Sequence, residues 1–74
     1  MAETVLRIRL TGGDHVDVTY EETDVVEETE VAEHAIAILA DEAGMLRSRH
    51  GERLVVIYGR GVAAVEVSPR GAVL

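Results

Sequence analysis

The sequence predicts a small α+β fold of the order ββα(β)ββ, with a single antiparallel or mixed sheet and one helix packed on one face. Three patterns predict it. Apolar residues alternate with polar ones near the start, recur at helical spacing in the middle, and form two nearly unbroken runs toward the end. Alternation is typical of half-buried strands, and recurrence every three or four residues is typical of an amphipathic helix. The length of 74 residues indicates a single domain over residues 1–74.

The first two strands are predicted to form a hairpin around Gly12-Gly13-Asp14. The alternating apolar residues are Leu6, Ile8, Leu10, Val16, Val18 and Tyr20. A two-residue Gly12-Gly13 loop would set Ile8 opposite Asp17 and mix the two faces. A three-residue loop over Gly12–Asp14 keeps apolar residues together, with Leu10 on Val16, Ile8 on Val18, Leu6 on Tyr20 and Arg9 opposite Asp17. Because a one-residue slip turns every side chain to the other face, we expect the three-residue loop.

The middle segment predicts a helix from Thr29 to Ala43. Its apolar stripe consists of Ala32, Ala35, Ile36, Leu39, Ala43 and Leu46, broadened by Val31 and Ile38. Thr29 is the expected N-cap, and Asp24 with Glu27 is an alternative start one turn earlier. Gly44 is expected directly after the helix in the left-handed conformation.

The last part of the chain predicts a second hairpin. The runs Leu54–Tyr58 and Val62–Val67 flank Gly59-Arg60-Gly61. A three-residue loop pairs Ile57 with Ala63, Val55 with Val65 and Arg53 with Val67 on one face. The other face then pairs Tyr58 with Val62, Val56 with Ala64 and Leu54 with Glu66.

The segments on either side of this hairpin are shorter. Met45–Arg49 is expected to be a short strand that turns at His50-Gly51 and sets Arg49 opposite Glu52. The alternative is that the helix continues through it. Ser68-Pro69-Arg70-Gly71 is a predicted turn, followed by the apolar segment Ala72–Leu74.

The second hairpin is apolar on both faces, whereas a lone helix covers only one side of a small sheet. An exposed apolar cluster on so small a chain usually marks an interface. We therefore expect a homodimer in which sheet packs on sheet, and a possible protein partner that binds the apolar face or an edge strand. The expected interface residues are Leu54, Val56, Tyr58, Val62 and Ala64. Alternatively, the apolar tail or a curled hairpin covers this face within one chain.

One cluster of basic residues suggests a different function. It consists of Arg47, Arg49, His50, Arg53 and Arg60. The planar guanidinium fork suits carboxylate or phosphate, so an alternative is a small anion- or nucleotide-phosphate-binding protein. Another interpretation is that these arginines favour the carboxyl end of the helix and neutralise the chain's own acidic surface.

The remaining residues give no catalytic pattern. The chain has no cysteine and no lysine, and its net charge is −7. His34 has Glu30 one turn earlier, but no second histidine lies four residues away from it. Neither His15 nor His50 has a nucleophile or an acidic residue at a spacing that would indicate a site. We therefore expect no enzyme activity, no cofactor and no metal site. The acidic balance argues against nucleic acid. The absence of a signal-peptide pattern or a long apolar stretch argues against a membrane and for a cytoplasmic location.

One stretch carries a resemblance to other proteins. Residues Met45 to Val56, followed by Val62-Ala63-Ala64-Val65-Glu66-Val67, resemble the C-terminal half of small uncharacterised proteins from high-GC bacteria. Their pattern runs from a short strand through a charged turn to a second strand, and then to a strand ending near Val-Glu-Val. The resemblance implies a similar ββα-then-β arrangement and no functional residues to transfer.

Overall fold

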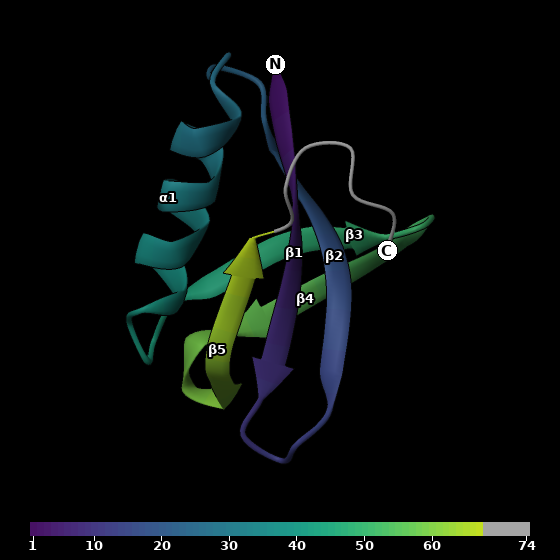
Figure 1. The fold of residues 1–74 in the computed structure, drawn as a ribbon, viewed down its shortest axis with the longest axis vertical. Helices are drawn as coiled ribbons and strands as arrows, with labels where there is room; N and C mark the ends of the chain where they lie inside the picture. Colours follow the sequence, from purple (N-terminus) through teal and green to yellow (C-terminus); the bar gives the residue numbers. More distant parts are fainter. Residues whose placement is uncertain (68–74) are drawn as a thin grey trace.

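The computed structural model describes residues 1–67 and confirms the α+β class. It contains one five-stranded sheet in the order β4-β3-β2-β1-β5, with every neighbouring pair antiparallel, so the mixed alternative is wrong. One helix, α1, packs on this sheet (Figure 1). The elements are β1 (Ala2–Leu10), β2 (His15–Glu22), α1 (Glu28–Leu39), β3 (Met45–His50), β4 (Arg53–Tyr58), the 3₁₀ turn η1 (Gly59–Gly61) and β5 (Val62–Val67). The turn and apolar segment predicted for 68–74 lie outside the described residues.

The β1–β2 hairpin forms, but its register differs from the prediction. Ile8 lies opposite Val16, Leu6 opposite Val18 and Arg7 opposite Asp17. The predicted pairs Leu10–Val16, Ile8–Val18, Leu6–Tyr20 and Arg9–Asp17 are therefore wrong by two residues, although the two faces are as expected.

The position of the loop explains this shift. The loop has three residues as predicted, but they are 11–13, because the amide of Leu10 donates to the carbonyl of Asp14 at 2.8 Å. Gly13 takes the third loop position with φ of 100°. A type I turn followed by one residue at positive φ needs glycine there, and this requirement fixes the register.

The helix is shorter than predicted at its carboxyl end. It begins at Glu28 and ends at Leu39, with Glu27 rather than Thr29 or Asp24 as N-cap. Its buried residues, Val31, Ala32, Ala35 and Leu39, belong to the predicted stripe. Gly44 is not left-handed, so that prediction is wrong. Its role is close approach, since a Cβ on Gly44 would lie 1.8 Å from the carbonyl oxygen of Ile38.

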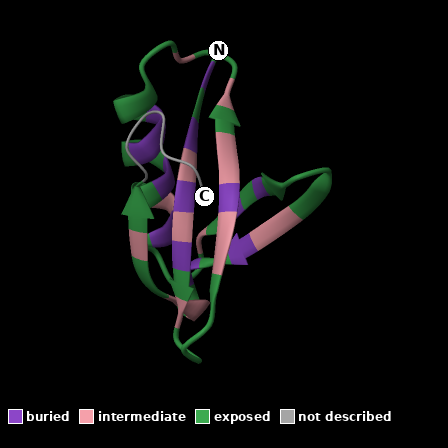
Figure 2. Ribbon diagram, turned by 45° about the vertical axis from the view of Figure 1, so that its right-hand side comes forward, coloured by how far each residue is buried: buried purple, intermediate pink, exposed green. Residues whose placement is uncertain are grey.

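The predicted strand at Met45–Arg49 is confirmed as β3, which excludes a helix running through it. β3 pairs with β4, so that Arg49 lies opposite Leu54 and His50 opposite Arg53. The turn is therefore Gly51-Glu52, and the predicted pairing of Arg49 with Glu52 is wrong. Gly51 has φ of 62°, which a tight two-residue turn requires. The tip of this ribbon projects beyond β2 (Figures 1 and 2).

The predicted β4–β5 hairpin does not form. β4 and β5 are the two edges of the sheet, and η1 joins them because the β3–β4 ribbon crosses behind β1 and β2 (Figure 1). The crossing brings the end of β4 to the start of β5. Gly59 N–H donates to Gly44 O at 2.9 Å, and Thr11 N–H donates to Gly61 O at 3.0 Å.

β5 pairs with β1 instead of β4. Ile8 lies opposite Val65, and Arg7 lies opposite Glu66. The pairing also joins Arg9 Nε to Glu66 Oε2 at 2.6 Å. None of the predicted pairs between 53–58 and 62–67 exists, because β1 offers the same apolar match together with opposite charges.

The core lies inside the curled sheet and is closed by α1. Figure 2 shows the buried residues along the strands and on the side of α1 that faces them. β1, β2, β3, β4 and α1 all contribute to the core cluster: Leu6, Ile8, Val18, Ala35, Leu39, Leu46 and Ile57. The opposite side of the sheet has no helix in the described residues, so its side chains decide what this chain offers to other molecules.

Candidate functional site

The outer side of the β3–β4 ribbon gathers large apolar side chains with arginines. The register sets Met45 opposite Tyr58, Arg47 opposite Val56 and Arg49 opposite Leu54. Leu54 is 64% exposed, Tyr58 47% and Met45 46%. We call this surface the ribbon face and define it by its six residues: Met45, Arg47, Arg49, Leu54, Val56 and Tyr58.

The ribbon face exists because β4 is apolar at every position after Arg53. In a strand, successive side chains point to opposite sides. Ile57, 5% exposed, and the half-buried Val55 pack inward against the core. The alternate residues must therefore point outward, where no element of the described chain covers them. The strand is apolar on both sides, as the sequence indicates, and only one side is buried within the subunit.

The structure divides the predicted interface residues. Leu54, Val56 and Tyr58 share the ribbon face, whereas Val62 and Ala64 lie on β5 at the other edge of the sheet. Val62 is half-buried opposite Leu10, and Ala64 lies exposed opposite Arg9. The separation follows from the β4–β5 hairpin that does not form. Met45 also belongs to the ribbon face but is absent from the predicted interface, because only the register of β3 against β4 places it beside Tyr58.

The basic cluster is divided as well. Arg47 and Arg49 point outward on the ribbon face, while His50 and Arg53 face each other at the tip on the opposite side of the ribbon. His50 Nδ1 lies 2.6 Å from the carbonyl oxygen of Asp17. Arg60 lies in η1 at the other end, with its guanidinium 5.0 Å from the centre of the Tyr58 ring. These five side chains do not converge on one anion.

The two arginines on the ribbon face differ in their partners. Arg49 Nη2 lies 3.8 Å from Glu3 Oε2 and 3.7 Å from Glu21 Oε1, which is ion-pair range but longer than a hydrogen bond. Arg47 forms no ion pair or hydrogen bond through its side chain within residues 1–67. The ribbon face therefore carries positive charge that the subunit balances only in part.

The charge of the whole chain is unevenly distributed around this surface. Residues 45–61 contain four arginines and one glutamate, Glu52, whereas residues 1–44 contain two arginines and twelve acidic residues. The ribbon and η1 thus form a positive region on a chain whose net charge is −7. Such a region raises the local concentration of acidic partners.

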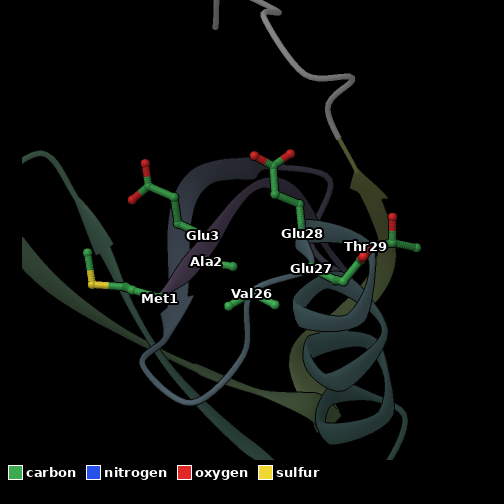
Figure 3. Close-up of a pocket in the computed structure, with 7 residues that line it drawn as sticks. All are labelled: Met1, Ala2, Glu3, Val26, Glu27, Glu28 and Thr29. Atoms are coloured by element: carbon green, nitrogen blue, oxygen red, sulfur yellow. The ribbon is translucent and has the colours of Figure 1, made fainter.

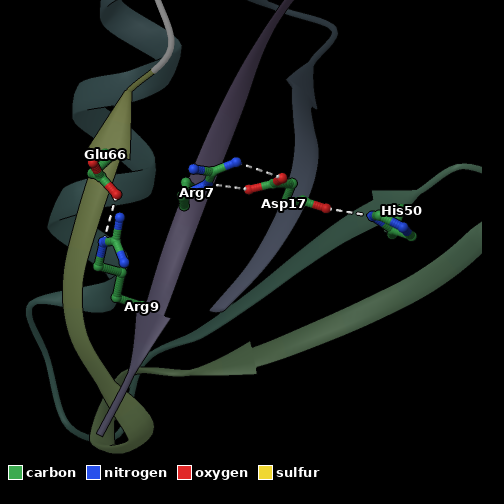
Figure 4. A network of polar contacts seen from close by, with 5 residues as sticks. All are labelled: Arg7, Arg9, Asp17, His50 and Glu66. Atoms are coloured by element: carbon green, nitrogen blue, oxygen red, sulfur yellow. Dashed lines mark hydrogen bonds and ion pairs between the residues drawn. The ribbon is translucent and has the colours of Figure 1, made fainter. Parts of the chain in front are cut away.

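The other half of the outer side is neutralised by its own charges. Figure 4 shows Arg7 meeting Asp17 through two hydrogen bonds, of 2.8 and 3.1 Å, and Arg9 meeting Glu66 on β5. The hydrogen bond from Arg7 lowers the pKa of Asp17, and the same bond raises the pKa of Arg7. Because these charged groups already form hydrogen bonds with each other, they are poor binding groups for a ligand. They hold β5, β1 and β2 together across the sheet.

His34 lies apart from the ribbon, on α1. Its Nδ1 is 2.6 Å from Glu22 Oε1 on β2, and its Nε2 is 3.8 Å from Glu30 Oε1, the partner expected from the sequence. The hydrogen bond with Glu22 raises the pKa of His34, and the charges of Glu22, Glu30 and Glu33 add to this effect. Within the described part of the chain, no group of three or more histidine and acidic side chains has the arrangement of a metal site.

One hollow lies at the opposite end of the molecule from η1 (Figure 1). Its volume is about 610 Å³, and Figure 3 shows Met1, Glu3, Val26 and Glu28 among the residues that line it. The lining combines acidic carboxylates with apolar side chains and the Thr29 hydroxyl.

A smaller hollow runs beside the free side of β4. It encloses about 360 Å³ between Leu10 and Val16 at the ends of β1 and β2 and Val55, Ile57 and Tyr58 on β4. In the described sheet β4 pairs only with β3. Its other side therefore presents unpaired peptide groups beside an apolar hollow. Edge strands usually carry a charge, a proline or a bulge that prevents pairing with another chain, but residues 54–58 contain no charged residue and no proline.

Comparisons with protein-family models, with curated proteins and with solved structures gave no match. The resemblance of Met45–Val56 and Val62–Val67 to small proteins of high-GC bacteria therefore stays a prediction. None of the helices in residues 1–67 has the length and apolar character needed to cross a membrane.

Proposed function

We propose that this chain is a non-enzymatic protein-interaction module that forms a homodimer through β4. The proposal rests on the exposed apolar side chains and the unpaired edge of this strand. From Leu54 to Tyr58 it is apolar on both sides, it is exposed on the ribbon face, and its free edge has neither a charged residue nor a proline there. A second copy offers the same edge and satisfies the free peptide groups by a two-fold contact.

The sequence of β4 supports one antiparallel register. Setting Val56 opposite Val56 of the second copy places Leu54 opposite Tyr58 on the ribbon face. The same register sets Val55 opposite Ile57 on the inner side. All of these cross-strand pairs are apolar, and pairs of this kind contribute roughly 0.2–1 kcal/mol each beyond the main-chain hydrogen bonds.

Side-by-side pairing also suits the charges better than the face-to-face packing expected from the sequence. Arg47 and Arg49 lie on β3, one strand away from the proposed two-fold axis. Stacking two ribbon faces would instead bring four arginines together inside the contact, and like charges in a desolvated contact are costly.

Sedimentation velocity tests the dimer. The wild-type chain, whose subunit mass is 8.0 kDa, is expected to sediment at twice that mass. Leu54→Glu is expected to be monomeric with an unchanged far-UV circular dichroism spectrum, because Leu54 is 64% exposed in the subunit. Val26→Glu is the matched control: Val26 is 82% exposed and remote from the ribbon, so its variant should remain dimeric. A wild-type mass of one subunit at every concentration would refute the proposal.

A second pair of variants tests the two sides of β4. Val56→Asp lies on the ribbon face and should dissociate the dimer without unfolding the subunit. Val55→Asp sets its carboxylate against the core cluster and should unfold the subunit, since an unpaired carboxylate packed against apolar side chains is strongly unfavourable. Two unfolded variants would contradict the assignment of the faces.

Anion binding is the second candidate, and one observation favours it: Arg47 has no acidic partner within residues 1–67. The separation of Arg53 and Arg60 at opposite ends of the ribbon weighs against it, because a phosphate is normally held by several converging donors. A thermal-shift screen with inorganic phosphate and nucleotides tests this candidate, with Arg47→Ala/Arg49→Ala as the variant. The absence of any shift for the wild-type chain would exclude it.

A further inference from the structure

We infer that the paired ribbon faces of the dimer bind an acidic amphipathic helix of a partner protein. The inference rests on the proposed dimer, and it adds the kind of partner and the place where that partner lies. It starts from two rows of side chains on each subunit. The outward residues of β4 are apolar, and the outward residues of β3 include Arg47 and Arg49.

The dimer would arrange these rows symmetrically. Pairing β4 with β4 of the second copy gives the strand order β3-β4-β4-β3 at the centre of a continuous sheet. Neighbouring strands lie about 4.8 Å apart, so the two arginine rows would be about 14 Å apart. The apolar side chains of Leu54, Val56 and Tyr58 from both copies would fill the space between them. An α-helix with its side chains is about 10–12 Å wide and fits between the rows.

The charges of the ribbon face favour an acidic helix. The ribbon face contains two arginines and no carboxylate, and Arg47 is unpaired within residues 1–67. A helix with an apolar stripe and glutamates on both flanks would bury the stripe on β4 and reach an arginine on each side. Guanidinium and carboxylate groups form paired hydrogen bonds, so this contact is specific for carboxylates.

The same charges disfavour larger anions. A helix of about 14 residues is about 21 Å long, close to the length of a six-residue strand, and would contact the ribbon alone. A nucleic acid duplex or an anionic bilayer extends further and would meet the surface of residues 1–44, where twelve acidic residues accompany two arginines. That repulsion opposes binding.

Fluorescence anisotropy with a labelled peptide tests the inference. The probe is a peptide of about 14 residues with leucines at positions i, i+3, i+4 and i+7 and glutamates on both flanks. A peptide with glutamines in place of the glutamates is its control. We expect one acidic peptide bound per dimer, a gain of helical circular dichroism on binding, and weaker binding as salt increases.

Two variants separate recognition from folding and assembly. Arg47→Gln/Arg49→Gln should weaken binding about tenfold or more while the sedimentation mass stays that of a dimer. Arg9→Gln is the matched control, since Arg9 also lies on the outer side of the sheet but is paired with Glu66, and it should bind as the wild type does.

Each contrary result has a distinct meaning. A wild-type dimer that fails to bind the acidic peptide overturns the inference and leaves the dimer intact. Equal binding of the glutamine peptide, or unchanged binding by Arg47→Gln/Arg49→Gln, overturns recognition by charge. Binding of one peptide per subunit overturns the two-row geometry. A monomeric wild-type chain refutes the proposed function itself, and the inference with it.

Discussion

Gly44 and Gly59 pack closely against the backbone that follows α1, and replacing either of them should lower the stability of the fold. A Cβ on Gly44 would lie 1.8 Å from Ile38 O, and one on Gly59 would lie 2.0 Å from Asp41 O. Both oxygens belong to the backbone, so no side-chain rotation relieves the clash. Gly59 N–H also donates to Gly44 O at 2.9 Å, so both glycines belong to a single contact.

The structure sets the size of the effect. Overpacking a closed site costs about 1–3 kcal/mol, and a clash with fixed backbone belongs at the upper end, so we expect Gly44→Ala to lower the free energy of unfolding by about 3 kcal/mol. A domain of this length has a total stability of roughly 4–11 kcal/mol. At 4–8 °C for each kcal/mol, the thermal midpoint should fall by about 12–24 °C.

Thermal and urea unfolding followed by far-UV circular dichroism measure this loss, at one fixed protein concentration because a dimer of the proposed kind would make the midpoint depend on concentration. Gly12→Ala is the control: a Cβ there meets nothing within 4 Å, and the residue is not left-handed. It should leave stability within about 0.5 kcal/mol of the wild type. If Gly44→Ala unfolds at the same midpoint as Gly12→Ala, the close packing of this turn against α1 is refuted.

The two perturbed ionisable pairs give opposite pH dependences. The pKa of Asp17 is lowered in the folded state, so the stability it contributes is present above the unfolded carboxyl pKa of about 3.9 and is lost as the pH falls further. Urea midpoints of the wild type and Asp17→Asn should therefore differ at neutral pH and converge near pH ~2; a constant difference would contradict this. The pKa of His34 is raised, so its contribution is present below about pH 6.5 and is lost as the pH rises through the folded pKa. Wild-type stability should fall more steeply than that of His34→Gln above this pH, and parallel curves would show that the contact with Glu22 has no energetic effect.

Part of the candidate site, the residues of each strand that share the ribbon face, can be predicted from the sequence. Leu54, Val56 and Tyr58 share a face because strand side chains alternate, and this rule needs no knowledge of the fold. Arg47 and Arg49 share a face for the same reason. What the sequence did not reveal is that the two rows lie side by side, because that depends on the pairing of β3 with β4. A β4–β5 hairpin would add Val62 and Ala64 to this face, but β5 pairs with β1 instead.

Local patterns determined which segments become strand and helix, and in β1, β2 and α1 they also determined which side faces the core. The alternation in residues 6–20 and the helical stripe from Val31 to Leu39 act over a few residues, so they survive in any tertiary arrangement. Tertiary structure decided which strands pair. Main-chain hydrogen bonds do not depend on the side chains, so they do not select one partner strand. Apolar runs such as β4 and β5 match several partners equally well. The crossing of the ribbon and the attraction of Arg9 to Glu66 placed β5 beside β1. The same choice left β4 as an open edge.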